Sequence, residues 1–264
     1  MSLSQSEINS SIKLIIETFK EFRPELMHHY GNVAHLSKDN DSPVTELDVK
    51  VETELKARLL EQFPEFGFRG EETAAVVGDN GATWYVDPID GTTCFIHGLP
   101  FCTNMAGLVV DGEPVAGIIY DFVNEALYTT IKGEGAYRDG VKLSVNNQPL
   151  NNSLVYSDRI TFINTTDILF EYKINSFAPV GASGHYYTLL AEGKIHGIMK
   201  LRSISQVHDN VAGVLLAREA GAQVLSFETD DYKFDNLEFV LGTPNFIEVA
   251  AERKADIAAA MPPH

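Results

Sequence analysis

The stretch WYVDPIDGTTCFIHGLPFC, residues 84 to 102, is the most informative part of this sequence. An apolar run ends in Asp87, and Pro88 and Asp90 follow before Gly91 and two threonines. Proline fixes its own backbone angle and cannot donate a hydrogen bond to a sheet. Glycine permits a tight turn and a close approach to a ligand. The pattern predicts a buried strand that ends in a pair of carboxylates.

The residues after the second carboxylate favour an anion site. A helix can begin at Gly91, Thr92 and Thr93. Its first N–H groups would have no partner within the helix, so they could bind a phosphate. Carboxylates beside such a seat suit Mg²⁺, which prefers oxygen ligands and bridges to substrate phosphates. The stretch therefore predicts metal-assisted phosphate chemistry.

Three further acidic motifs stand at the ends of expected elements: Asp48 in VTELD, Glu71 and Glu72 in GEE, and Asp209 in HDNVAG. Each also has a purely structural explanation. Asp48 would suit the dipole at the start of a helix, the two glutamates would suit a solvated loop, and Asp209 would suit the N-cap of the helix that follows. The residues alone leave both sets of explanations open.

Composition limits the classes of partner. The chain has 264 residues and a net charge of −17, from 37 acidic and 20 basic residues. That charge argues against nucleic acid as a bulk partner, because phosphate backbones bind stripes of Lys and Arg. The sequence has no run of eighteen apolar residues, so it predicts no membrane span. The N-terminus is typical of an amphipathic helix, not of a signal peptide. Cys94 and Cys102 lack metal-type spacing and predict reduced core thiols in a cytoplasmic protein.

The expected elements form two parts. Residues 1–150 are expected to be an α+β part with an antiparallel sheet and most of the acidic motifs, and residues 151–264 an α/β part with Asp209. The expected elements are a helix over 4–22 that ends near Pro24, a helix over 44–63 with Thr45 as N-cap, a strand over 83–90, an antiparallel meander over 102–143 with a hairpin at 132–140, and a frayed tail at 255–264.

Together, VTELD, GEE, WYVDPIDGTTCFIHGLPF and HDNVAGVLLAREAGA resemble the inositol monophosphatase family, within the lithium-sensitive, Mg²⁺-dependent phosphatases. The resemblance extends from about residue 5 to about residue 250. It implies an α/β fold layered as an αβαβα sandwich and a hydrolase that uses an activated water on a small phosphorylated polyol, such as inositol-1-phosphate. It also implies a homodimer, two to three Mg²⁺ ions per active site, with Mn²⁺ as a possible substitute, and inhibition by Li⁺.

The resemblance also implies roles for individual residues. Glu71, Asp87 and the Ile89 carbonyl would hold one Mg²⁺, and Asp87, Asp90 and Asp209 would hold a second. Glu71 would also support a third, looser ion.

Catalysis and binding are assigned by the same resemblance. Thr92, oriented by Asp48, would position the attacking water and help to deprotonate it, with Glu71 as the third catalytic residue. The residues implied to bind the phosphate or to support the site are Gly91, Thr92, Thr93, Glu72 and Lys38.

Two departures from the family pattern concern the substrate and the metal. His208 stands where the family commonly has Trp, which predicts either a packing change or a group beside the metal. Lys200 stands near the position of a substrate-binding Glu, with Arg202 close by, in a loop about two residues longer. If these cations bind substrate, they would favour a second phosphate or a carboxylate; the alternative is that both face solvent.

The departures leave other functions open. The same chemistry could act on 3′-phosphoadenosine 5′-phosphate, fructose-1,6-bisphosphate or histidinol phosphate. A non-catalytic regulatory protein on the same fold is the alternative from another class, and the complete set of expected ligands argues against it.

Overall fold

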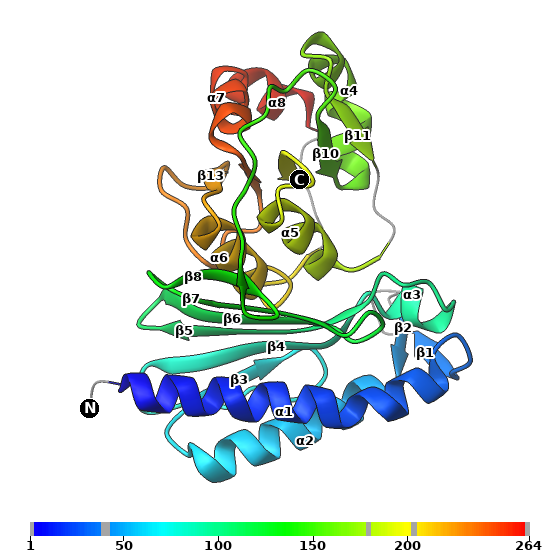
Figure 1. Ribbon diagram of the computed structural model, residues 1–264, viewed down its shortest axis with the longest axis vertical. Coiled ribbons are helices and arrows are strands. Elements are labelled where there is room, and N and C mark those ends of the chain that lie inside the picture. Colours follow the sequence, from blue (N-terminus) through cyan, green and yellow to red (C-terminus); the bar gives the residue numbers. More distant parts are fainter. Residues whose placement is uncertain (1–2, 38–42, 178–180, 202–204, 262–264) are drawn as a thin grey trace.

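The computed structural model describes residues 3–37, 43–177, 181–201 and 205–261. Lys38 and Arg202 lie outside the described residues. The chain builds five layers in the order helix, sheet, helix, sheet, helix (Figure 1). The expected αβαβα sandwich is therefore confirmed.

Two helices form the first layer: α1 (Gln5–His29) and α2 (Glu46–Gln62). The prediction that the first helix ends near Pro24 was wrong, since it continues to His29. Proline in a helix removes one backbone hydrogen bond. Packing offsets this loss, because Leu26 is fully buried beyond the proline and Arg23 Nε donates to the Phe122 carbonyl at 2.8 Å.

The second layer is a seven-stranded sheet in sequence order. Its strands are β3 (Gly67–Gly70), β4 (Ala82–Asp90), β5 (Thr103–Val110), β6 (Glu113–Asp121), β7 (Ala126–Ile131), β8 (Gly135–Arg138) and β9 (Val141–Lys142). The pair β3–β4 is parallel and the other pairs are antiparallel. The expected meander and its hairpin at 132–140 are thus confirmed.

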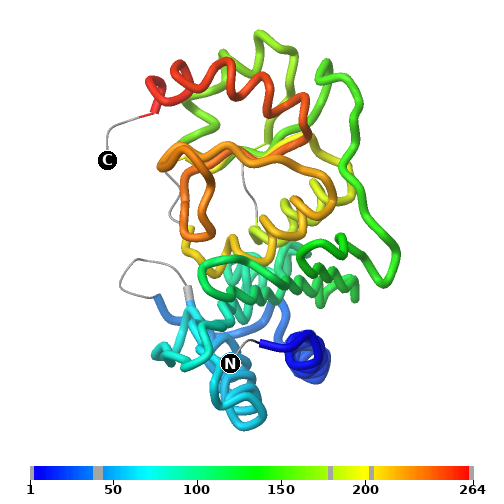
Figure 2. The backbone as a smooth tube through the Cα atoms, turned by 90° about the vertical axis from the view of Figure 1, so that its left-hand side faces the viewer, coloured from blue at the N-terminus to red at the C-terminus, as the bar shows by residue number. Residues whose placement is uncertain are grey.

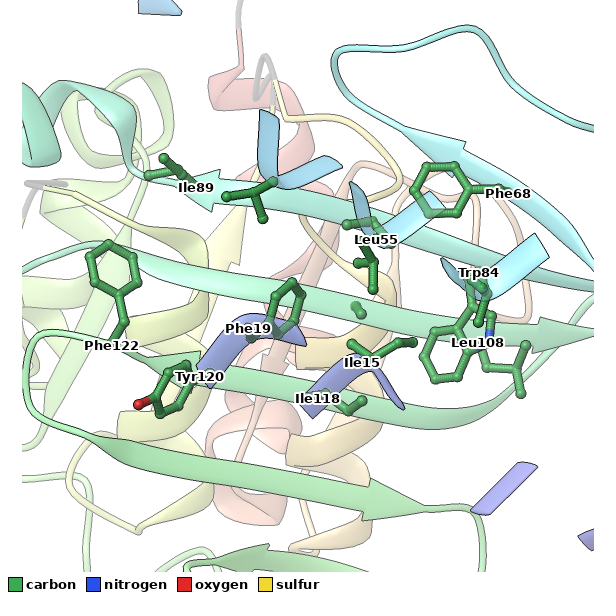
Figure 3. Close-up of a cluster of buried hydrophobic side chains, with 14 of the residues drawn as sticks. Ile15, Phe19, Leu55, Phe68, Trp84, Ile89, Leu108, Ile118, Tyr120 and Phe122 are labelled. Atoms are coloured by element: carbon green, nitrogen blue, oxygen red, sulfur yellow. The ribbon is translucent and has the colours of Figure 1, made fainter. Parts of the chain in front are cut away.

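A hydrophobic core joins the first helix layer to this sheet. Ile15 and Phe19 of α1 and Leu55 of α2 lie with Trp84 and Leu108 of the sheet, all fully buried (Figure 3). Apolar residues recur every three or four positions in the helices and every second position in the strands. Because α2 is fixed on β4 by this core, Asp48 at its start is held near the end of β4.

Helices α5 (Ser183–Ala191) and α6 (Val211–Glu219) form the middle layer. They separate the first sheet from a five-stranded sheet in the order β11-β10-β12-β14-β13. Its strands are β10 (Leu154–Ser157), β11 (Asn175–Phe177), β12 (Gly197–Lys200), β13 (Gln223–Ser226) and β14 (Phe239–Gly242). Gly107 lets α6 approach the first sheet, because a Cβ there would lie 2.5 Å from Val211 Cγ1. The start of α6 is therefore held against the middle of β5.

The outer layer contains α4 (Arg159–Glu171), α7 (Pro244–Glu252) and α8 (Lys254–Ala260). The prediction of a frayed tail was wrong for the last of these helices, because Ile257 is buried in the core beneath it. The connection over 143–153 runs from the first sheet past the middle layer to the second (Figure 2). The division of the chain near residue 150 stays a prediction.

Two remaining features complete the fold. Strands β1 (His35–Ser37) and β2 (Pro43–Thr45) pair with each other, and α3 (Thr92–Ile96) follows β4 directly. Cys94 and Cys102 are buried and unpaired, as expected. Among the described residues, no helix combines the length and apolar character needed to cross a membrane.

Candidate metal centre

Strand β4 ends in an irregularity that presents two carboxylates. The register between β4 and β5 shifts between Asp87 and Asp90, with Pro88 in the interval. Asn104 Nδ2 donates to the Pro88 carbonyl at 2.5 Å, and Asp87 Oδ1 accepts from the Ile89 N–H at 3.1 Å. Both carboxylates are buried, with 3% and 5% exposure. The strand exit predicted from the sequence is therefore a rigid, desolvated corner.

Asp209 joins these two carboxylates from a distant part of the chain. Carboxylate oxygens of Asp87, Asp90 and Asp209 all lie within 4.8 Å of one another. The N-cap explanation of Asp209 was wrong, because Asn210 occupies the N-cap of α6. Asp209 Oδ2 instead accepts from the Gln206 N–H at 2.6 Å. That bond fixes the aspartate in the loop that faces the end of β4.

A second group of ligand atoms shares Asp87. Atoms of Glu71, Asp87 and His208 also lie within 4.8 Å of one another. Glu71 is the most exposed of the three, at 27% of its side chain. Sequence reasoning had not counted His208 among the candidate ligands; its position next to Asp209 was the signal that could have included it.

The electrostatics of these groups favour a bound cation. Burial raises the pKa of Asp87 well above its usual range, and Glu71, Asp90 and Asp209 raise it further. Burial, followed by the charge of Asp209, raises the pKa of Asp90 to about 6 against three stabilising hydrogen bonds. Buried carboxylates this close repel unless a proton or a metal neutralises them. Hard oxygen donors in this arrangement fit a divalent cation such as Mg²⁺ or Mn²⁺.

The Asp48–Thr92 pair lies beside the metal ligands. The Thr92 hydroxyl has two acceptors within reach for its one proton, Asp48 Oδ1 at 3.2 Å and the Ile89 carbonyl at 3.0 Å. The other Asp48 oxygen accepts from the Thr45 N–H and hydroxyl at 2.8 and 2.6 Å. Thr45 is the N-cap of α2, as predicted. A carbonyl has two lone pairs, so the Ile89 oxygen can accept from Thr92 and still contact an ion.

Burial also changes the basicity of Asp48. It raises the pKa of this carboxyl above its usual value, while hydrogen bonds from Thr45 and Thr92 lower it. A raised pKa makes a carboxylate a stronger base near neutral pH. Asp48 is thus placed to polarise the Thr92 hydroxyl.

Gly91 connects the strand to α3 in the left-handed conformation, with φ of 86°. A Cβ at this position would lie 2.6 Å from the Phe101 carbonyl. Only glycine therefore permits the turn that places Thr92 and Thr93 at the start of α3. The first N–H groups of a helix lack intrahelical acceptors, which makes these amides available to an anion.

Glu52 is a supporting residue that sequence reasoning missed. Its side chain is fully buried in α2 and accepts from the Glu72 and Thr73 N–H groups at 2.9 and 2.7 Å. A Cβ on Gly70 would lie 2.1 Å from the Glu52 carboxyl carbon. Glu52 therefore fixes the backbone of the turn that carries Glu71. Glu52 lies four positions after Asp48, about one turn along the same face of α2. That spacing was the sequence signal that could have placed Glu52 near the site.

We expect Glu52→Gln to weaken metal binding without removing it. The amide can accept one of the two N–H bonds, but its NH₂ group would face the other donor, which costs about 1–3 kcal/mol. Mn²⁺ affinity should fall about tenfold, as measured by calorimetric titration. The exposed Glu54→Gln change on the same helix is the matched control and should leave the affinity unchanged. Equal affinities for the two variants would contradict the positioning role.

Lys200 is buried, so the solvent-facing explanation was wrong for this residue. It is 3% exposed, and its Nζ donates to Asn210 Oδ1 at 2.8 Å over the ring of Tyr187. Burial lowers the pKa of Lys200, while the charges of Asp209 and Asp90 oppose that shift. Lys200 is therefore a buried cation near the carboxylates of Asp209 and Asp90.

Comparison with known proteins agrees with this geometry. A model described as the inositol monophosphatase family matches residues 6–262. Inositol monophosphatase 1 of Solanum lycopersicum is 30% identical over 240 residues, which cover 85% of this chain and 86% of that protein. The extragenic suppressor protein suhB of Bartonella henselae has a TM-score of 0.79 at 26% identity, covering 92% of this chain and 97% of that one. An IMPase of Thermotoga maritima shares the fold, with a TM-score of 0.80 at 22% identity over 96% of this chain and 100% of that one.

The layered fold, the converging carboxylates and these relatives define a phosphatase of a metal-dependent class. The chain belongs to the inositol monophosphatase family. Its reaction is therefore the hydrolysis of a small phosphorylated substrate.

Proposed function

We propose that this protein is a Mg²⁺-dependent phosphomonoesterase that hydrolyses a small phosphorylated polyol of the inositol-1-phosphate type. The observation that carries the proposal is the pair of ligand groups that share Asp87. Beside them the Asp48–Thr92 contact supplies a base and a hydroxyl. Phosphoryl transfer needs positioning and charge stabilisation more than covalent chemistry, and this corner provides both.

The proposed roles assign each residue one task. Glu71, Asp87 and the Ile89 carbonyl would hold one ion, and Asp87, Asp90 and Asp209 a second. When bound, divalent ions would neutralise charge on the phosphoryl oxygens and activate the attacking water.

The remaining residues would place the substrate and move the proton. The Thr92 hydroxyl would hold the attacking water by a hydrogen bond, and Asp48 would draw the Thr92 proton toward its Oδ1. The amides of Gly91, Thr92 and Thr93 would bind the phosphate. Glu72 would support the turn that carries Glu71.

A second candidate substrate carries another anionic group, such as a second phosphate. Lys200 supports this candidate, because it places a cation near Asp209 and Asp90. Its hydrogen bond to Asn210 favours the polyol phosphate, since a second anion would have to displace that bond. Arg202, the other proposed cation, and Lys38, the proposed supporting residue, stay predictions.

A substrate panel tests the proposal. It contains inositol-1-phosphate, 3′-phosphoadenosine 5′-phosphate, fructose-1,6-bisphosphate and histidinol phosphate, each assayed with Mg²⁺ and with a chelator. We expect the highest kcat/KM for inositol-1-phosphate and a loss of all activity on chelation. Preference for a bisphosphate would move the assignment to the second candidate, and activity that persists in chelator would overturn the metal-dependent mechanism.

We expect Lys200→Glu to destabilise the protein more than it changes substrate preference. A buried carboxylate at this position would face Asn210 Oδ1 and lie near Asp90 and Asp209. The free energy of unfolding of the variant should therefore fall by about 3–5 kcal/mol. Denaturant unfolding measures this effect. Lys20→Glu, at an exposed position of α1, is the comparison and should change stability by less than about 1 kcal/mol. A stable Lys200→Glu variant that now prefers different substrates would instead place Lys200 at the substrate.

The proposal includes four further expectations from the family resemblance. They are two to three Mg²⁺ ions per site with Mn²⁺ as a substitute, inhibition by Li⁺, a homodimer, and a cytoplasmic location. Activity assays with Mn²⁺ or Li⁺ and sedimentation analysis test the first three directly.

A further inference from the structure

We infer that His208 is a ligand of the metal ion at Glu71 and Asp87, so that this site has a nitrogen donor and prefers Mn²⁺ or Co²⁺ over Mg²⁺. The inference rests on the proposed metal centre and goes beyond it in one respect. It changes the chemistry of one site from all-oxygen to mixed nitrogen and oxygen.

The position of the imidazole carries the inference. His208 Nε2 lies 4.0 Å from Glu71 Oε2 and 3.5 Å from Asp209 Oδ1. Its ligand atom also lies within 4.8 Å of Glu71 and Asp87 ligand atoms. Two donors on one six-coordinate ion at about 2.1 Å lie about 3.0 Å apart when adjacent and about 4.2 Å apart when opposite. The 4.0 Å between His208 Nε2 and Glu71 Oε2 lies in this range.

The environment of the ring suits a ligand better than a packing group. The His208 side chain is only 12% exposed and contacts the carboxylates of Glu71 and Asp209. Both carboxylates are hydrogen-bond acceptors. A ring that only filled space here would therefore face charged groups and not apolar ones. A neutral imidazole with its proton on Nδ1 can offer the Nε2 lone pair to a cation held by Glu71 and Asp87.

The tertiary fold makes this contact possible. Asp209 is fixed by its bond to the Gln206 N–H, and Asn210 occupies the N-cap position of α6. His208 is therefore held between the Asp87–Asp90–Asp209 group and the Glu71 turn. The loop that supplies a carboxylate to one group supplies an imidazole to the other.

Donor type predicts the metal preference. Mg²⁺ is a hard ion that gains little from an imidazole, whereas affinity for nitrogen donors rises from Mn²⁺ to Co²⁺. We therefore expect Mn²⁺ to bind at least about tenfold more tightly than Mg²⁺. His208→Phe, which keeps an aromatic ring of similar breadth, should reduce that ratio about tenfold and leave Mg²⁺ affinity within about twofold.

The test uses the full chain and Mn²⁺ itself as the probe. Pulsed electron paramagnetic resonance detects a ¹⁴N coupling when an imidazole coordinates Mn²⁺, and Mg²⁺ competition gives the affinity ratio. The variants are His208→Phe and, as the matched control, His28→Phe at the exposed end of α1. We expect the coupling in the parent chain and in His28→Phe, and its loss in His208→Phe.

Three results would overturn the inference. Mn²⁺ that binds the parent chain without a ¹⁴N coupling would show that His208 is not a ligand, even if His208→Phe fails to fold. A coupling that persists in His208→Phe would assign the nitrogen to another residue. A parent chain that binds no Mn²⁺ would overturn the proposed metal centre as well, which separates that failure from the failure of His208 alone.

Discussion

Asp90→Asn abolishes phosphate release while the protein stays folded; this is the largest effect that we expect on activity. Asp90 belongs to the Asp87–Asp90–Asp209 group; it is 5% exposed, and its ligand atom lies within 4.8 Å of those of Asp87 and Asp209. An amide carries no charge, so the second proposed ion would lose an anionic ligand and be held less tightly. We expect kcat/KM to fall by at least about a thousandfold, which corresponds to about 4 kcal/mol of transition-state stabilisation.

The fold should tolerate this change because two effects oppose each other. Asp90 accepts from the Ser183 and Gly184 N–H groups at 2.9 and 2.6 Å and from Thr103 Oγ1 at 3.0 Å. An asparagine NH₂ would leave one backbone donor without an acceptor, which costs about 1–3 kcal/mol. The same substitution removes repulsion with Asp209, which stabilises the metal-free protein.

The matched control is Asp139→Asn in the turn between β8 and β9. Asp139 has a positive φ of 49°, a conformation that asparagine also adopts readily. It should keep full activity. Circular dichroism and a phosphate-release assay on both variants measure the outcome, and an active Asp90→Asn enzyme would remove Asp90 from the mechanism.

Divalent cations raise the melting temperature of the parent protein, and the rise depends on pH; this is the largest effect that we expect on stability. At a Mg²⁺ concentration about 100 times Kd, binding to the native state contributes about 2.7 kcal/mol. For a chain of this size, that corresponds to about 5–10 °C. Calorimetry with millimolar Mg²⁺ and phosphate measures the shift. An unchanged melting temperature would count against the whole site.

The pH dependence follows from the raised pKa of Asp90. In the metal-free protein the folded value is about 6, against a reference value of 3.8, with burial as the main cause. The native state therefore binds more protons than the unfolded state between these values. Protonation of Asp90 therefore adds to the free energy of unfolding of the metal-free protein. This addition is fully present below about pH 4 and is lost as the pH rises to about 6.

Metal binding should show the complementary trend. A cation must displace protons from Asp90 and from Asp87, whose pKa is also raised by burial, so the shift in melting temperature with Mg²⁺ should grow from pH 5 to pH 7. The Asp90→Asn variant lacks the Asp90 part of this titration, so its shift should grow less over the same range. A Mg²⁺-induced shift that stays constant across this range would contradict the assignment of Asp90 as a ligand.

Much of the fold followed from local patterns in the sequence. The Thr45 N-cap, the strand that ends at Asp90 and the meander after Cys102 were predicted from local patterns and are confirmed. They depend on short-range rules, such as capping, turn chemistry and alternation of apolar residues. The layered sandwich, which the family resemblance implied, is confirmed as well. Elements that depend on distant packing were predicted less well. The first helix continues past Pro24 and the tail near Ile257 is helical, because contacts made elsewhere in the fold stabilise them.

The candidate site, like the fold, was predicted in part from local sequence patterns and depends in part on distant packing. By itself, the sequence determined which side chains could carry phosphate chemistry, because carboxylates next to a proline and a glycine at a strand end are a local signal. The family resemblance implied that Asp209 joins Asp87, and the tertiary structure brings them together and leaves Asn210 at the N-cap of α6. Only the tertiary structure decided that Lys200 is buried, that Glu52 accepts from the backbone of the Glu71 turn, and that His208 lies beside Glu71. Each of those facts is a distance between residues far apart in the chain or a loss of contact with water, and both arise only when the layers pack.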